Sequence, residues 1–177
     1  MKLSLFSLMN IMKIFKIIGT LLVLGLSVSV YAQGKVEDSK YNAMLTQFLD
    51  HNVPEINVDE VGENVIYLDT RELKEYKVSH IKGAIWVGYI GFKMSRLKEL
   101  PKDSKIVVYC SVGYRSEKIT KKLKSKGYTD VSNLYGGIFE WVNQSRVVVD
   151  SEGVLTTKVH AYDKEWGVWL QKGEKVY

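Results

Sequence analysis

The chain has 177 residues, enough for one domain with a hydrophobic core plus extensions and too few for two well-filled domains. The formal net charge is +5. Three of the 25 basic residues are lysines in the first 32 residues, a segment without an acidic residue, so the rest of the chain has 22 basic against 20 acidic residues. This near-neutral balance argues against a nucleic-acid partner, and the lysines from Lys118 to Lys126 are typical of a solvated helix face.

Residues 1–32 have the form of a secretory signal peptide. Lysines precede an apolar stretch from Ile17 to Val30, and Val30-Tyr31-Ala32 places small or aliphatic residues where a signal peptidase reads the chain. We predict cleavage after Ala32, which would make the protein exported, either periplasmic or secreted, with no membrane contact after cleavage. The alternative is an uncleaved membrane anchor, for which this largely apolar stretch of 14 residues is short, because a helical span needs about 20.

Residues 33–56 are predicted to form an N-terminal linker followed by a first helix that ends before Asn52 and Pro54. The prediction rests on apolar residues that recur at helical spacing, namely Tyr41, Met44, Leu45, Phe48 and Leu49.

The domain proper is predicted over residues 57–142, where short apolar strands alternate with helices. Strands are expected around residues 56–58 and at 65–68, 84–87, 105–109 and 131–134. Helices are expected at 72–76 with Thr70 as the cap, at 92–100 before Pro101, at 117–126 before Gly127, and from Ile138 after a Gly136-Gly137 turn. Strands that are apolar on both faces and alternate with helices indicate an α/β fold with a parallel sheet covered on both sides.

Residues 143–177 are predicted to form a C-terminal extension. Two valine-rich runs, 147–149 and 154–155, flank Asp150-Ser151-Glu152-Gly153 as a hairpin with a four-residue turn. The tail that follows is too apolar to remain in water, since it contains Tyr162, Trp166, Trp169 and Leu170. We expect the tail to pack on the domain; the alternative is an aromatic patch that binds a partner.

Cys110, the only cysteine, follows an apolar strand and opens a polar loop with a helix behind it. A lone cysteine is often a small buried apolar filler, and it cannot form an internal disulfide. Here, however, the backbone N–H groups of the loop and the nearby Arg115 are placed to favour a thiolate, which is the attacking species. We therefore predict Cys110 and Arg115 as catalytic residues, and as substrate-binding residues Ser111, Val112, Gly113, Tyr114 and Ser116.

Four segments, in this order and spacing, resemble a single-domain rhodanese-like protein of the thiosulfate sulfurtransferase type. They are Leu68-Asp69-Thr70-Arg71, His80-Ile81-Lys82-Gly83-Ala84, Cys110 to Ser116, and Leu134-Tyr135-Gly136-Gly137-Ile138 with Trp141. The resemblance implies a rhodanese fold, with a parallel sheet of about five strands. It also implies that a Cys110 persulfide carries sulfane sulfur from a donor such as thiosulfate to a small thiol or a protein thiol.

The same resemblance assigns roles to residues outside the loop. Asp69 and Arg71 are expected to form a structural pair, and Arg71 is the better candidate for contact with an anionic donor. His80 is expected to support a turn through a hydrogen bond. The sequence shows no metal-ligand spacing, and no cofactor is expected.

Two alternatives remain at this level. Cysteine-dependent phosphatases and arsenate reductases place five residues between cysteine and arginine, whereas here there are four, from Ser111 to Tyr114; by resemblance, the shorter loop suits a sulfur atom. The second alternative is a non-catalytic rhodanese-fold module that binds a partner or senses oxidation, because a fold does not guarantee turnover.

Overall fold

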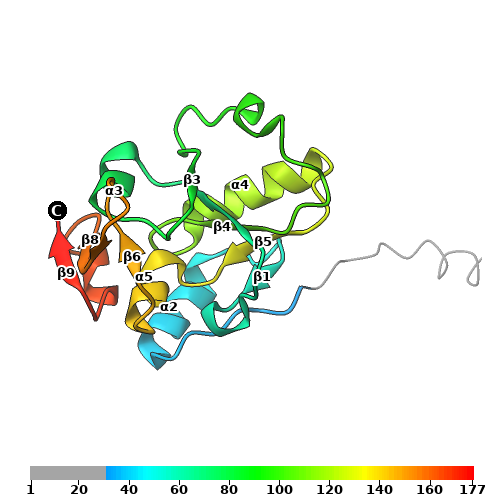
Figure 1. The fold of residues 1–177 in the computed structure, drawn as a ribbon. Coiled ribbons are helices and arrows are strands. Elements are labelled where there is room, and N and C mark those ends of the chain that lie inside the picture. Colours follow the sequence, from blue (N-terminus) through cyan, green and yellow to red (C-terminus); the bar gives the residue numbers. More distant parts are fainter. Residues whose placement is uncertain (1–30) are drawn as a thin grey trace, which may run out of the picture. The chain divides into compact units, whose positions relative to one another are not determined.

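The computed structural model describes residues 31–177, so the predicted signal sequence up to Val30 lies outside the described residues. Five strands form one parallel sheet in the order β1-β5-β4-β2-β3 (Figure 1). The strands are β1 (Glu55–Ile56), β2 (Ile66–Asp69), β3 (Ile85–Trp86), β4 (Ile106–Tyr109) and β5 (Val131–Leu134). This architecture confirms the predicted α/β class with a five-stranded parallel sheet.

Helices cover both faces of the sheet, as its apolar strands require. They are α2 (Ser39–Phe48), α3 (Leu73–Val78), α4 (Tyr114–Ser125) and α5 (Gly137–Asn143). Alternate residues of β4 divide the core: Val108 packs with Leu123 of α4, whereas Val107 packs with residues of α2 and α5 on the other face. Because β4 is buried on both faces, its carboxyl end is a rigid support for the loop that starts at Cys110.

Two local predictions were wrong. The segment predicted as a helix at 92–100 contains only the 3₁₀ helix η2 (Met94–Leu97), in which Arg96 N–H donates to the carbonyl of Lys93 three residues earlier. Thr70 does not cap α3; its hydroxyl donates to the carbonyl of Tyr109 at 2.9 Å and so ties the end of β2 to β4. The residue before α3 is Glu72. A further 3₁₀ helix, η1 (Val58–Glu60), follows β1.

The C-terminal extension contains the hairpin β6 (Val148–Val149) and β7 (Leu155–Thr156), a parallel pair β8 (Lys158–His160) and β9 (Glu174–Val176), and η3 (Trp166–Trp169). The β8–β9 pair lies beside α3 (Figure 1). Leu170 is fully buried in the core that α2 and α5 share, and Asn143 of α5 holds the extension by donating to the carbonyl of Trp169 at 2.9 Å. Within residues 31–177, none of the helices combines the length and the hydrophobicity of a membrane span.

Candidate active site

The loop between β4 and α4 presents Cys110 at the carboxyl edge of the sheet. Gly113 occupies the position before α4 with φ +115°, a conformation that glycine adopts without strain, and it lets the chain turn directly into the helix. Cys110 is 1% exposed, and its sulfur accepts a hydrogen bond from Gly113 N–H at 3.2 Å. Ser116 Oγ lies 3.5 Å from the same sulfur and 3.0 Å from the Gly113 carbonyl. Its single proton can serve only one of these acceptors at a time.

The start of α5 fixes the orientation of the loop. The N–H groups of Ile138 and Phe139 donate to the carbonyls of Cys110 and Ser111 at 2.9 and 3.1 Å. In a trans peptide the carbonyl and the next N–H point in opposite directions, so the N–H groups of Ser111 and Val112 point away from α5.

The first turn of α4 adds further donors to the loop. Within residues 31–177, the N–H groups of Tyr114, Arg115 and Ser116 have no hydrogen-bond acceptor, as is usual for the first turn of a helix. Gly113 N–H already donates to the Cys110 sulfur, and these amides are available as further donors to an anion bound at the loop.

Arg115 is held by a carboxylate that sequence reasoning missed. Its Nη1 and Nη2 donate to Oε2 and Oε1 of Glu75 at 2.7 and 2.9 Å, and Nη2 also donates to Ser111 Oγ at 2.9 Å. The Glu75 side chain is fully buried. Burial alone would raise the pKa of Glu75, but the hydrogen bonds and the charge of Arg115 outweigh it and hold this pKa below its ordinary value.

The pKa of Arg115 moves in the opposite direction. Burial alone would lower it, but the hydrogen bond with Glu75 and the proximity of Cys110 raise it above its ordinary value. The guanidinium is thus permanently charged, and Glu75 balances that charge. Sequence signals for Glu75 are weak, because two glutamates, Glu72 just before α3 and Glu75 within it, lie close together and Arg115 is 40 residues away.

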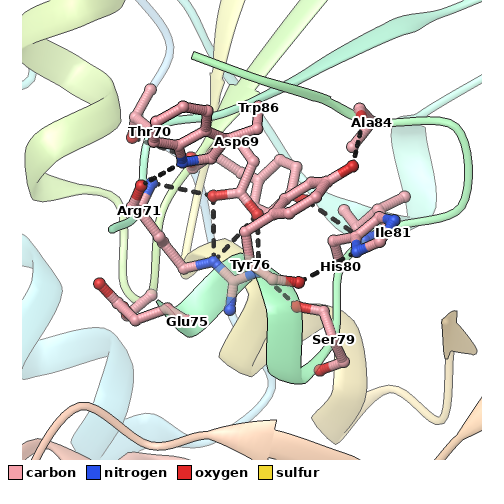
Figure 2. A network of polar contacts seen from close by, with 12 residues as sticks. Asp69, Thr70, Arg71, Glu75, Tyr76, Ser79, His80, Ile81, Ala84 and Trp86 are labelled. Carbon is pink, nitrogen blue, oxygen red and sulfur yellow. Dashed lines mark hydrogen bonds and ion pairs between the residues drawn. The ribbon is translucent and has the colours of Figure 1, made fainter. Parts of the chain in front are cut away.

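Asp69 and Arg71 form the expected pair, in the network shown in Figure 2. Arg71 Nη2 donates to Asp69 Oδ2 at 2.6 Å and to the carbonyl of Ser79 at 2.6 Å, and Nε donates to Asp69 Oδ1 at 3.0 Å. Arg71 is 0% exposed and does not line the pocket beside Cys110. This burial corrects the expectation that Arg71 contacts an anionic donor, because its charge is already used to fix the strand end.

His80 also has a structural position. Its Nδ1 lies 3.1 Å from the carbonyl of Tyr76, and its ring stacks on that of Tyr76 with centroids 3.9 Å apart (Figure 2). Its backbone pairs with Val149 in an antiparallel bridge, which links α3 to the hairpin. This arrangement agrees with the turn-supporting role predicted for His80.

A pocket of about 380 Å³ lies beside Cys110, and we call it the Cys110 pocket. Its walls come from five parts of the chain and consist of Phe48, Glu72, Tyr89, Ile90, Cys110, Ser111, Val112, Tyr114, Arg115, Tyr162 and Trp166. The pocket brings together the predicted residues Ser111, Val112 and Tyr114 with Cys110 and Arg115. Gly113 and Ser116 do not line it and instead contact the Cys110 sulfur. The sequence did not single out the other aromatic residues as parts of the site, because they lie far from Cys110 along the chain.

Within residues 31–177, no group of three or more His, Cys, Asp or Glu side chains is arranged to hold a metal ion. The groups present at the candidate site are the Cys110 sulfur, the loop amides and the guanidinium of Arg115 paired with Glu75.

Comparisons with known proteins place this arrangement in context. The family model for the Rhodanese-like domain matches residues 54–144. The Bacillus subtilis protein YrkF, whose name describes it as a candidate sulfur carrier, is 29% identical over 100 residues, which cover 53% of this chain and 54% of YrkF. The tRNA uridine(34) hydroxylase of Oceanobacillus iheyensis is 29% identical over 119 residues, which cover 64% of this chain and 36% of that enzyme.

Among solved structures, the rhodanese-like domain of an Anabaena sp. protein aligns with a TM-score of 0.50 and 25% identity. The alignment covers 55% of this chain and 79% of that domain. The chain spans about half the length of YrkF and about a third of the hydroxylase, so these likenesses concern only part of each relative.

Proposed function

Because the chain belongs to the rhodanese-like domain family, we propose that it is a sulfurtransferase that carries sulfane sulfur as a persulfide on Cys110. In the first step the Cys110 thiolate attacks the outer sulfur of a donor. A new S–S bond forms on Cys110, and the old S–S bond breaks with its electron pair leaving on the donor remnant, which is sulfite when the donor is thiosulfate. In the second step a thiophilic acceptor, such as a small thiol or a protein thiol, removes the outer sulfur and regenerates the thiolate.

The observation that carries the proposal is the position of the Cys110 sulfur. Cys110 lines a pocket, its sulfur accepts a hydrogen bond from Gly113 N–H at 3.2 Å, and the first-turn amides of α4 follow directly after the loop. A terminal persulfide sulfur carries negative charge, and converging N–H groups at a helix start stabilise such a charge.

Arg115 and Glu75 have separate roles in this proposal. Arg115 supplies a fixed positive charge next to Cys110 and Ser111. Glu75 is a positioning residue, because it binds both terminal nitrogens of Arg115 but does not itself line the pocket, whereas Arg115 does. The same pairing disfavours the phosphatase alternative, since a phosphate would compete with Glu75 for the guanidinium.

We also propose that the chain is exported after cleavage behind Ala32. The proposal rests on the lysine-bearing start and the apolar run of the first 32 residues. The donor and the acceptor would then be compounds or proteins of the periplasm or the exterior.

The test is to incubate the purified protein with thiosulfate, polysulfide and glutathione persulfide and to measure its mass. We expect Cys110 to gain one sulfur atom, the Cys110→Ser variant to gain none, and cyanide to yield thiocyanate over many turnovers. A protein that gains no sulfur from any of the three donors would contradict the proposal. A single modification without turnover, which changes affinity for a partner, would favour the non-catalytic module instead.

A further inference from the structure

Part of the Cys110 pocket is built from segments that lie outside the family match at residues 54–144. Phe48 precedes the match, and Tyr162 and Trp166 follow it. The ring of Phe48 lies 5.0 Å from that of Tyr114 and 5.0 Å from that of Trp166, centroid to centroid, so three rings form one continuous wall. The family domain alone therefore does not determine what this pocket accepts.

A further aromatic ring contacts the cation of the site. The Tyr162 ring lies 5.4 Å from the guanidinium carbon of Arg115, which is the distance of a cation–π contact. Arg115 is thus engaged by Glu75 on one side and by an aromatic face on another. A free dianion would have to compete with Glu75 for the terminal nitrogens of Arg115.

The remaining charges of the pocket do not favour an inorganic dianion. Among the residues of 31–177 that line it, the only charged side chains are Glu72 and Arg115. The next cation along α4, Lys118, lies 5.0 Å from the Tyr114 ring and forms an ion pair with Asp50. A thiosulfate dianion would find the loop amides and no unpaired cation, and it would approach the Glu72 carboxylate.

The size and lining of the pocket favour a larger apolar group. A volume of about 380 Å³ lies in the range of small-molecule sites, and a five-atom anion would leave most of it unfilled. Burial of an aromatic or aliphatic group against Phe48, Tyr114 and Trp166 is favourable, because it removes apolar surface from water on both sides.

We propose that the Cys110 pocket selects organic sulfane-sulfur donors with an aromatic or bulky apolar group, such as organic persulfides and thiosulfonates, over inorganic thiosulfate. This inference rests on the proposed function. For a thiosulfonate, R–SO₂–S⁻ reacts with the Cys110 thiolate to give R–SO₂⁻ and the Cys110 persulfide anion. One S–S bond forms, one breaks, and the sulfinate leaves with the electron pair, so no other oxidant or reductant is needed. The outer sulfur faces the loop amides while R lies against the aromatic wall.

The experiment compares three donors with the same transferable sulfur: benzenethiosulfonate, methanethiosulfonate and thiosulfate. The rate at which the full chain gains sulfur at Cys110 is followed by mass spectrometry in single-turnover reactions. Each rate is divided by the rate of alkylation with iodoacetamide, which reports the reactivity of the sulfur itself. The rate with benzenethiosulfonate is then divided by the rate with methanethiosulfonate. The same ratio of rates, measured with a free small-molecule thiol in place of the protein, corrects for the intrinsic reactivity of the two donors. The corrected donor ratio measures how well the protein recognises the apolar group.

Two variants and one control test the aromatic wall. Trp166→Ala removes one ring of the wall, and we expect it to lower the corrected donor ratio by about tenfold. Tyr162→Asn removes a half-exposed ring at a residue with φ +68°, which asparagine tolerates, so this variant should fold and should also lower the ratio. Val168 lies in the same 3₁₀ helix as Trp166, is 60% exposed and is not part of the pocket. The control Val168→Ala should therefore leave the ratio unchanged.

The outcomes separate the two proposals. A ratio that stays the same in both Trp166→Ala and Tyr162→Asn, or a wild-type protein that takes sulfur from thiosulfate as fast as from benzenethiosulfonate, would overturn the pocket inference and leave the persulfide mechanism standing. Failure of all three donors, and of glutathione persulfide, to add sulfur at Cys110 would overturn the proposed function itself.

Discussion

Buried charged residues at this site are neutralised in pairs. Asp69 with Arg71 and Glu75 with Arg115 both lie at the carboxyl edge of the sheet, and the carboxylate in each pair is fully buried. Desolvated charges are costly unless each has its partner and its hydrogen bonds. The two pairs differ in use, because Arg71 is sealed inside the fold whereas Arg115 reaches the Cys110 pocket.

Loss of Asp69 should destabilise the protein strongly. Asp69→Asn leaves the Arg71 charge without its partner, and Arg71 Nη1 already has no hydrogen-bond partner within the described residues. We expect the free energy of unfolding in urea to fall by about 3–5 kcal/mol. Asp59→Asn, a change at an exposed acid in η1, should cost less than about 0.5 kcal/mol. Equal losses in the two variants would show that the buried pair is not the cause.

Glu75 should make stability depend on pH. Its pKa in the folded protein lies below the ordinary 4.5, so ionised Glu75 contributes stability above that value, and the contribution is lost as the pH falls through the folded pKa. In the Glu75→Gln variant this contribution is absent at every pH. We therefore expect the difference in unfolding free energy between wild type and variant to narrow as the pH falls from about 6 to about 3. A difference that does not change with pH would contradict the assigned pairing.

At the scale of elements, α5 determines the geometry of a loop that precedes it by more than 20 residues in the chain. The first N–H groups of α5 bind two loop carbonyls, and this fit requires close backbone approach at Gly137. A Cβ at Gly137 would lie 2.5 Å from the carbonyl oxygens of Cys110 and of Ser111. The helix start therefore positions the loop through its own backbone, with no side chain between the two.

Gly137→Ala should damage both the fold and the site. We expect a loss of roughly 2–5 kcal/mol in unfolding free energy, which combines the cost of φ +56° for alanine with the steric clash, and a changed rate of iodoacetamide reaction at Cys110. Gly127→Ala is the matched control, because Gly127 has φ +86° and nothing within 4 Å of a Cβ; it should cost only about 1 kcal/mol. Similar costs for the two variants would refute the close-approach argument.

At the scale of the whole described molecule, the C-terminal extension belongs to the same core as the sheet. Leu170 is 0% exposed and packs in the cluster formed by α2, α5 and one face of the sheet, and Trp169 stacks on Tyr41 with centroids 5.4 Å apart. The family match ends at residue 144, yet the core continues beyond it. The extension thus contributes both to stability and to the wall of the Cys110 pocket.

Truncation of Leu170 should test this continuity. Leu170→Ala removes a fully buried side chain and should lower the unfolding free energy by about 2–5 kcal/mol in one cooperative transition. Val168→Ala, at a neighbouring exposed residue, should change it by less than about 0.5 kcal/mol. If Leu170→Ala were as mild as the control, or if the extension unfolded separately, the extension would have to be regarded as an independent unit.

The proposed export predicts that the chain is shortened and leaves the cytoplasm when it is made in a cell. Expression in a bacterial host with a functional secretion pathway should give a soluble exported form whose first residue is Gln33, as determined by N-terminal sequencing. Ala32→Asp, which places a charge where the peptidase requires a small residue, should retain the longer form. A wild-type protein that keeps residues 1–32 and sediments with membranes would instead support the uncleaved anchor.

The sequence by itself determined the local features of the fold. Apolar runs predicted the strands, Gly127 indicated the end of α4, and the polar loop after Tyr109 indicated the candidate site, since each signal depends on neighbours in the chain. The prediction for residues 92–100 was wrong because it also relied on local spacing alone. The apolar spacing fits an α-helix, but only the short 3₁₀ helix η2 forms there.

Tertiary structure alone decided the partners of the site residues. Glu75 meets Arg115 across 40 residues, and Tyr162 and Trp166 reach the Cys110 pocket from a segment beyond the family match. No local pattern distinguishes Glu75 from Glu72, or a tail aromatic that packs in the core from one that lines a pocket. These choices depend on which surfaces meet when the elements pack, because burial and charge pairing are set by neighbours in space and not by neighbours in sequence.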